Sequence, residues 1–353
     1  MATRLRPRLT NVAALAVEHA EGSRASLSPL LTADLAPELS KVIKVNRLGS
    51  GVTSSVFLAV HVGTLQLLAL KEIDVSSDGA RRAVHRELHS LRTQRSPLVD
   101  ASFTTEAQSC PHIVDYYGSI MRDSGKFCMA LEYVARGSLQ GWIDQCLSCP
   151  EPWLAHLAHQ GLEALSFFHA TGRLHRDIKP ANLLITQTGD LKLADFGIST
   201  AIDDGRVHVV LAGTRMFMSP ECLKGEGTAP SSDLWSLAST LATVALGKSP
   251  IGVAANEFEQ ISLAELAPAS VSGNPGLSRL FADFLGRCLE PVPDARPSPR
   301  ELMGHPFLEL RHGWEKKCQS VMWAVCEGGG ASGGLDPRNH NHAPAATVPG
   351  PTS

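Results

Sequence analysis

The spacing of apolar and polar positions divides the chain into three stretches. Between residues 42 and 133, apolar residues fall in short runs such as Leu65 to Leu70, which predicts mainly strands with one helix. From 134 to 310 the pattern is mainly helical. A last amphipathic stretch, Trp314 to Cys326, predicts a further helix within residues 311–327.

The two ends of the chain differ in composition from the part between them. Residues 1–41 form a leader that contains Ser, Ala and Pro, and we expect it to be flexible. Residues 328–353 are rich in Gly, Pro, Asn and Ala with few apolar anchors, so we expect a disordered tail. The folded part is therefore predicted to span residues 42–310.

Length and composition narrow the classes of protein. A chain of 353 residues exceeds what one core normally carries, so two lobes or domains are expected. The net charge of −3 does not favour general nucleic-acid binding, and no apolar run is long enough to span a bilayer. The eight cysteines are scattered, and Cys146 and Cys149 have no second pair, which argues against zinc. Without a secretory signal, we expect reduced thiols and a cytoplasmic location.

A glycine-rich stretch near the start of the folded part predicts a phosphate-binding turn. It runs from Leu48 through Gly49, Ser50 and Gly51 to Val56, between two predicted strands. The two glycines let the backbone approach phosphates without a Cβ in the way. Taken alone, such a turn is weak evidence for a nucleotide-binding site.

A lysine strengthens the prediction of a nucleotide site. Lys71 follows Val56 by fifteen residues in an apolar strand pattern, and is our candidate for holding the α- and β-phosphates. A half-buried lysine needs a carboxylate partner. We expect Glu87, on a helix-like stretch sixteen residues later, because Glu72 points to the opposite face of the strand.

A second group of polar residues has the spacing that phosphoryl transfer from a metal nucleotide requires. Asp177 is placed to accept the proton of a substrate hydroxyl, and Lys179 to neutralise charge on the moving phosphoryl group. Asn182, five positions after Asp177, and Asp195 offer the oxygens that Mg²⁺ prefers.

The run from Leu174 to Leu184, followed by Asp195-Phe196-Gly197, resembles the eukaryotic protein kinases. The resemblance implies an α+β, bilobal fold, with a small, mainly β N-lobe (about 42–133) carrying one regulatory helix and a larger, mainly α C-lobe (about 134–310). It also implies ATP and Mg²⁺ as cofactors. A lysine at position 179 marks serine/threonine and dual-specificity members.

The same resemblance implies an adenine site at the end of the N-lobe. Leu131 is at the gatekeeper position, and the Glu132 carbonyl and Val134 amide are expected to bond the adenine edge. The apolar residues expected on the two faces of the ring are Val56, Ala69 and Leu184.

Two further family features lie downstream. Glu221 is expected to pair with Arg296 at the end of the activation segment. Asp233 is expected to hold the backbone of the loop around Asp177.

Several flanking runs are similar to those of MAP kinase kinases, including Gly213 to Glu221, Pro111 to Gly118 and Ala130 to Leu139. The similarity implies a dual-specificity enzyme that phosphorylates Thr and Tyr in the activation loop of a MAP kinase. In the leader, basic and then apolar residues match the docking pattern for such a partner: Arg4, Arg6, Arg8, Leu15 and Val17. A mitochondrial presequence or a solvated leader also fits these residues.

Two departures from the family pattern keep alternatives open. Residues 203–212 contain no Ser or Thr where MAP kinase kinases carry two phosphoacceptors; Ser199 and Thr200 lie closer to Asp195. Residues 93–110 form a polar insertion after the Glu87 helix. The second hypothesis is therefore a serine/threonine kinase of a neighbouring branch, such as a MAP kinase kinase kinase. A pseudokinase scaffold is disfavoured because all the expected catalytic side chains are present.

Overall fold

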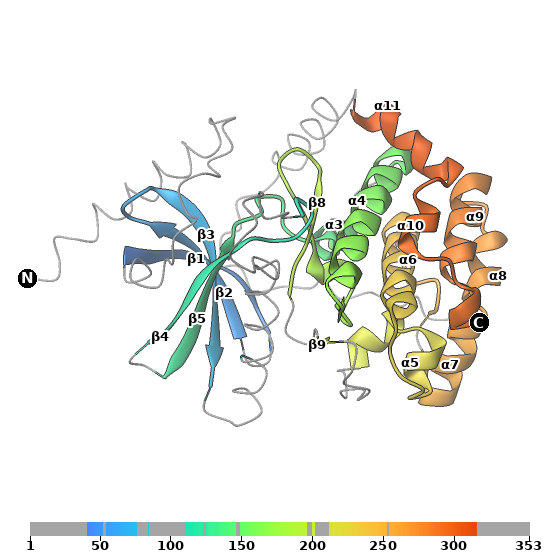
Figure 1. The fold of residues 1–353 in the computed structure, drawn as a ribbon, viewed down its shortest axis with the longest axis horizontal. Helices are drawn as coiled ribbons and strands as arrows, with labels where there is room; N and C mark the ends of the chain where they lie inside the picture. Colours follow the sequence, from blue (N-terminus) through green and yellow to red (C-terminus); the bar gives the residue numbers. More distant parts are fainter. Residues whose placement is uncertain are drawn as a thin grey trace, which may run out of the picture.

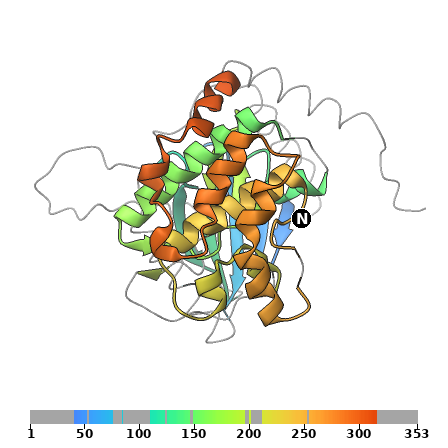
Figure 2. The same ribbon diagram turned by 90° about the vertical axis from the view of Figure 1, so that its right-hand side faces the viewer.

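The computed structural model describes residues 41–51, 54–75, 84, 110–122, 125–145, 149–195, 200–201, 212–252 and 254–315. A twisted sheet built from the first part of the chain lies at one end of the molecule, and helices from the second part lie at the other (Figure 1). When the molecule is turned so that the helices face the viewer, they lie in front of the sheet (Figure 2). The predicted bilobal α+β architecture is thus confirmed.

The N-lobe sheet has five antiparallel strands in the order β1-β2-β3-β5-β4. The strands are β1 (Val42–Ser50), β2 (Ser54–His61), β3 (Gln66–Asp74), β4 (Tyr116–Met121) and β5 (Lys126–Glu132). In this register Lys71 stands opposite Val56 on one side and Met129 on the other. Because strand side chains alternate between faces, Lys71 and Glu72 face opposite sides of the sheet.

The face of the sheet opposite Lys71 has its own apolar cluster, which includes Leu70, Cys128 and Ala130, all fully buried. Glu72 also lies on this face, where it forms a 2.5 Å ion pair with Lys44 and accepts a hydrogen bond from the Cys128 thiol. As the sequence predicted, Glu72 is directed away from Lys71.

The C-lobe is built around two long buried helices, α4 and α6, which pack against each other. Its helices are α3 (Leu139–Asp144), α4 (Glu151–Ala170), α5 (Pro220–Leu223), α6 (Pro230–Leu246), α7 (Glu257–Glu265), α8 (Ala267–Ser272), α9 (Arg279–Cys288), α10 (Pro299–Leu302) and α11 (Arg311–Glu315). Helix α6 starts with Pro230, whose fixed φ suits a first turn, and ends at Gly247 in the left-handed region (φ 67°).

Short elements between the lobes carry the polar residues that the sequence singled out. They are β6 (Arg173–Leu174), the 3-10 turn η2 (Pro180–Asn182), β7 (Leu183–Ile185), β8 (Leu191–Leu193), β9 (Thr200–Ala201) and η4 (Ala212–Phe217), with η5 (Pro293–Ala295) and η6 (Pro306–Leu310) further on. Isolated bridges join Ile113 to Leu193 and Ser138 to Leu184. These bridges tie the segments before β4 and α3 to the β7–β8 hairpin.

The expected pair between Glu221 and Arg296 is present and buried. Arg296 donates to both carboxylate oxygens of Glu221 at 2.9 and 3.2 Å, and its guanidinium lies over the Trp235 ring. Burial tends to raise the pKa of Glu221, but the hydrogen bonds from Arg296 outweigh it and hold the pKa below its usual value. The pair fixes α5 to the end of η5.

The end of the predicted C-terminal helix is only partly described. Helix α11 begins at Arg311, inside the predicted range, and Trp314 packs against Trp153 of α4. The rest of that prediction, the leader and the tail lie outside the described residues. Within the described part of the chain, no helix combines the length and apolar character needed to cross a membrane.

Candidate active site

Asp177 lies in the loop between β6 and β7, in contact with two of the predicted site residues. Lys179 Nζ donates to both of its carboxylate oxygens at 2.9 and 2.7 Å. Asn182, at the end of η2, donates through Nδ2 to Asp177 Oδ2 at 2.9 Å and to the Asp177 carbonyl at 2.7 Å. The carboxylate is therefore fixed in orientation, and its side chain remains 14% exposed.

A side chain from α6 holds the backbone of the loop around Asp177. Asp233 is buried and accepts from the His175 amide at 2.9 Å and the Arg176 amide at 2.8 Å, as the resemblance implied. Arg176 has a left-handed backbone (φ 66°), a conformation that costs about 1 kcal/mol in a non-glycine residue. The two hydrogen bonds offset that cost.

A histidine side chain contacts Asp233 in addition to the two amides. His169, in the last turn of α4, hydrogen-bonds Asp233 Oδ2 at 3.0 Å. Burial by itself raises the pKa of Asp233, but the bonds from His169 and the Arg176 amide bring it below its ordinary value. Asp233 is therefore ionised and couples α4, α6 and the Asp177 loop.

The buried His175 side chain also holds the Asp177 loop in place. Its Nδ1 accepts from the Asp177 amide at 3.3 Å, and its Nε2 lies 3.2 Å from the carbonyl oxygen of Ala194. Those partners require the proton on Nε2, because a carbonyl can only accept. Burial lowers the pKa of His175, so the ring is neutral and links Asp177 to the residue before Asp195.

Asp195 follows β8 and faces the N-lobe. The Ala194 amide donates to the Asn182 carbonyl at 2.9 Å, which places Asp195 beside the Asp177 loop. Asp195 has a left-handed backbone (φ 63°), and its Oδ1 accepts from Lys71 Nζ at 2.9 Å. Lys71 from the sheet and Asp195 from the C-lobe are thus brought together across 124 positions of sequence.

Several predicted residues fall where the structure gives no description. Glu87, the expected partner of Lys71, and Phe196 and Gly197 lie outside the described residues. The same holds for Ser199, for Asp203 and Asp204, and for most of the 93–110 insertion. The Lys71–Glu87 pair therefore stays a prediction.

The predicted nucleotide-binding residues line the sheet side of the same region. Gly49, at the β1 end, has open space around the position of a Cβ, and Ser50 and the exposed Leu48 flank it. Gly51 donates to the Ser54 carbonyl at 2.8 Å, which closes the turn.

The structure describes the backbone of most of the residues that are expected around the adenine ring. Ala69 stands opposite Leu131 in the β3–β5 pairing, and Leu184 lies in β7 below. The amide of Val134 donates no hydrogen bond to any residue in the described part of the chain. A backbone donor beside apolar residues is what the edge of an adenine requires.

Two contacts were not predicted from the sequence. The Glu132 side chain accepts from Lys192 at 2.7 Å and from the Asp115 amide at 3.1 Å, which fixes the end of β5 to β8. The bond between His169 and Asp233 joins residues 64 positions apart. Neither pairing has a local spacing that could have revealed it.

The donor set also fits a magnesium ion. Asn182 uses its Nδ2 toward Asp177, which leaves the amide oxygen Oδ1 without a hydrogen bond among the described residues. Asp195 supplies a carboxylate that is 44% exposed. Oxygen donors of this kind, two from the protein with the rest from water and phosphate, are typical of Mg²⁺ in phosphoryl transfer.

A sheet lobe and a helical lobe that place a lysine, a fixed aspartate and an amide–carboxylate pair between them define a protein kinase. Comparison with known families agrees: residues 42–308 match the model described as Protein kinase domain. The chain belongs to the protein kinase family and is a serine/threonine or dual-specificity enzyme.

Its relatives include mitogen-activated protein kinase kinases and a mitogen-activated protein kinase kinase kinase. Mitogen-activated protein kinase kinase 2 of Arabidopsis thaliana is 34% identical over 80% of this chain and 76% of its own length. Mitogen-activated protein kinase kinase 1c of Physcomitrium patens is 35% identical over 75% of each chain. Mitogen-activated protein kinase kinase kinase ANP1 of Arabidopsis thaliana is 29% identical over 80% of this chain and 42% of its own length.

Proposed function

We propose that this chain is a MAP kinase kinase, which transfers the γ-phosphoryl group of ATP to Thr and Tyr hydroxyls in the activation loop of a MAP kinase. The observation that carries the kinase chemistry is the fixed Asp177 carboxylate, held by Lys179 and Asn182 beside the Lys71–Asp195 pair. The choice of substrate rests on the relatives and on the MAP kinase kinase-like runs of the sequence.

Each residue has a defined task in this proposal. Asp177 orients the substrate hydroxyl and takes its proton, while Lys179, in contact with that carboxylate, offsets charge near the transferred group. Lys71 binds the α- and β-phosphates. Asn182 and Asp195 would hold Mg²⁺, which neutralises phosphate charge.

The remaining nucleotide contacts follow the same assignment. Leu48, Gly49, Ser50 and Gly51 cover the phosphates. The adenine ring lies between Val56, Ala69 and Leu184, beside Leu131, with its edge bonded to the Glu132 carbonyl and the Val134 amide. Cytoplasmic location and docking through the Arg4–Val17 leader stay predictions from the sequence.

A direct test uses purified wild-type protein and an Asp177→Asn control, with Mg·ATP and a panel of catalytically inactive MAP kinases. Phosphosites are then mapped by mass spectrometry. We expect paired Thr and Tyr phosphorylation in the activation loop of at least one substrate, at least about 10²-fold weaker with the control.

Other outcomes separate the alternatives. Phosphorylation of Ser and Thr alone, in other proteins, would contradict the MAP kinase kinase assignment and favour the neighbouring branch, to which the relative ANP1 belongs by name. The absence of transfer, together with no thermal stabilisation by Mg·ATP, would favour a scaffold.

A further inference from the structure

The long helix α6 carries four hydroxyl side chains between positions 236 and 243, and they bond in two different ways. They are Ser236, Ser239, Thr240 and Thr243. Inside a helix, such a hydroxyl often donates to the carbonyl of the residue four positions earlier. Thr240 does so toward Ser236 at 2.8 Å, and Thr243 does so toward Ser239 at 2.7 Å. The two threonines therefore bond within their own helix.

The two serines instead reach out of the helix to η4. Ser236 Oγ lies 2.7 Å from the carbonyl oxygen of Phe217 and 3.1 Å from that of Ser232 in its own helix. Because a hydroxyl has one proton to donate, the shorter contact with Phe217 is the stronger hydrogen bond. Ser239 Oγ lies 3.4 Å from the carbonyl oxygen of Met216. Two consecutive carbonyls of η4 are thus directed at α6.

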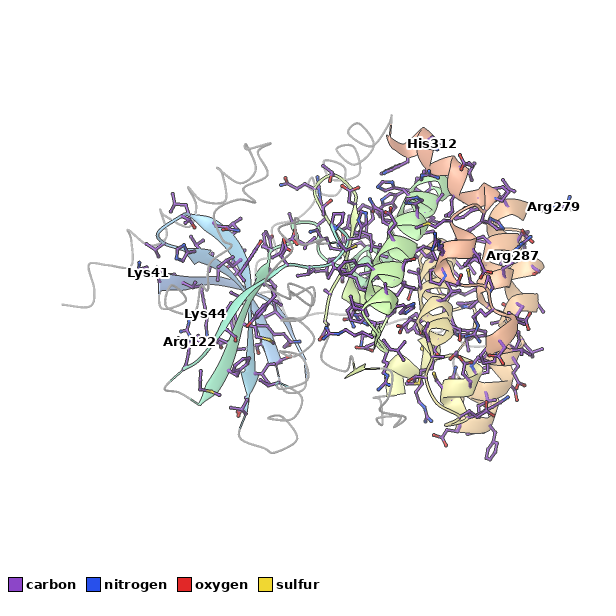
Figure 3. All side chains as sticks on the ribbon, in the orientation of Figure 1. Lys41, Lys44, Arg122, Arg279, Arg287 and His312 are labelled. Carbon is purple, nitrogen blue, oxygen red and sulfur yellow. The ribbon has the colours of Figure 1, made fainter. Side chains whose placement is uncertain are left out.

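These contacts lie in the interior of the helical lobe. Helix α6 runs through the middle of that lobe, whereas the labelled charged residues Arg279, Arg287 and His312 lie at its outer side (Figures 1 and 3). Phe217 and Ser239 are both buried. A carbonyl directed at a buried helix is shielded from water, so the loss of its hydrogen-bond donor carries a desolvation cost. The two hydroxyls therefore fix the position of η4.

The same face of α6 also holds the part of the chain that follows η4. Ser232, one turn before Ser236, donates to Glu221 of α5 at 2.9 Å. The three serines at 232, 236 and 239 are spaced by four and three positions, so they lie on one face of the helix. Along that face they hold the chain from η4 to α5 at three points.

A neighbouring side chain of α6 holds the loop around Asp177. Asp233 accepts from the amides of the two residues before Asp177, and it precedes Ser236 by three positions. Helix residues at that spacing have Cβ atoms about 5–6 Å apart. The chain that leaves Asp195 is tied to the start of the same loop, because β9 pairs with β6. The Asp177 loop and η4 are therefore anchored beside each other on one helix.

We propose that Ser236, assisted by Ser239, is a positioning residue for phosphoryl transfer, which holds η4 as a wall that aligns the substrate chain while a hydroxyl of that chain lies at Asp177. Met216 and Met218, which are partly exposed, lie along the path of the substrate chain. The adaptable methionine side chain suits chains of different sequence. This inference rests on the proposed function, because it takes a protein hydroxyl as the phosphoacceptor, but it holds for any protein that supplies one.

The test compares three properties of the wild-type and Ser236→Ala enzymes. They are kcat/KM for the protein that the wild-type enzyme phosphorylates fastest, KM for Mg·ATP, and the rate of ATP hydrolysis without a protein substrate. We expect kcat/KM for the protein to fall about fivefold to tenfold, because the substrate chain is less well aligned. The other two properties should stay the same, since neither the nucleotide nor an attacking water molecule needs the wall formed by η4.

Three further variants make the test specific. Thr243→Val is the matched control, because it removes a buried hydroxyl of the same helix that donates to the helix backbone, and it should behave as the wild type. Ser236→Thr keeps a hydroxyl and should recover most of the lost kcat/KM. Ser239→Ala removes the longer contact and should lower kcat/KM about twofold, which tests the inference even if Ser236→Ala does not fold.

The outcomes separate this inference from the proposed function. Equal kcat/KM values for the wild-type enzyme and both serine-to-alanine variants would overturn the role of the two hydroxyls and leave the proposed function intact. An equal loss in Thr243→Val, or a loss that extends to KM for Mg·ATP and to ATP hydrolysis, would also overturn it, because the effect would then lie in the stability of α6. A wild-type enzyme that phosphorylates no protein would overturn both proposals.

Discussion

At the scale of single residues, the site depends on groups whose protonation is set by burial. His175 is fully buried, and burial lowers its pKa, so it stays neutral where an exposed histidine begins to take up a proton. Asp233 has a lowered pKa and stays ionised because His169 and two backbone amides donate to it. Both groups keep the Asp177 loop in one arrangement.

These shifts predict that acid destabilises the folded protein. The folded-state pKa of His175 lies below the unfolded value of about 6.5, so below that pH the unfolded chain binds more protons. The free energy of unfolding should therefore fall as the pH is lowered from about 7 toward 5, as measured by urea unfolding at each pH. The decrease should be shallower in His175→Gln.

A matched histidine checks that assignment. His312 is 54% exposed and forms an ion pair with Glu309 at 3.2 Å, so His312→Gln measures what the replacement of an exposed histidine does to the same slope. Identical slopes for the wild type and His175→Gln would show that His175 does not contribute to it.

At the scale of elements, the sequence predicted the positions of the site residues better than the contacts that hold them. The spacing of Asp177, Asn182 and Asp195 predicted that these groups lie close together, and the structure places Asn182 against Asp177 and the residue before Asp195 against Asn182. The chemistry assigned to them stays a prediction. The opposite directions of Lys71 and Glu72 followed from strand alternation and agree with the Glu72–Lys44 pair.

The strand order and the long-range supports could not be predicted in the same way. An alternating pattern predicts a strand but not its neighbours, so it does not place Lys71 between Val56 and Met129. The contacts of His169 with Asp233 and of Glu132 with Lys192 depend on how α4, α6 and β8 pack. The Glu221–Arg296 pair was predicted only because of the resemblance to a family.

That buried pair gives a prediction at the element scale. Glu221→Gln leaves the Arg296 guanidinium, which is 0% exposed, without its counter-charge, and should lower the free energy of unfolding by roughly 3–5 kcal/mol. The control Arg287→Gln removes an exposed α9 pair with Asp283 and should cost less than about 1 kcal/mol. Similar values in urea unfolding would contradict the role assigned to the buried pair.

At the scale of the whole molecule, the unusual feature is an activation segment without the expected phosphoacceptors. Strand β9 pairs with β6 so that Ala201 stands opposite Arg173 and Thr200 opposite Leu174. Arg173 is buried, and burial lowers its pKa, whereas a negative charge near the guanidinium acts in the opposite direction. Asp203 and Asp204, which lie outside the described residues, follow Ala201 by two and three positions.

We therefore expect the acidic pair to substitute for phosphorylation. Wild-type enzyme treated with a phosphatase should keep most of its activity toward a protein substrate. The double variant Asp203→Asn, Asp204→Asn should lose about tenfold or more in kcat/KM, because it removes two negative charges and a hydrogen bond to a charged group contributes roughly 1.5–3 kcal/mol.

Two comparisons make this last prediction specific. Ser199→Ala and Thr200→Val remove the nearest hydroxyl groups, and under this hypothesis both variants should be as active as the wild type. If phosphatase treatment abolishes activity and phosphosite mapping finds modified Ser199 or Thr200, the segment is switched by phosphorylation instead. In that case the two aspartates would not control activity, and the double Asn variant should respond to phosphatase as the wild type does.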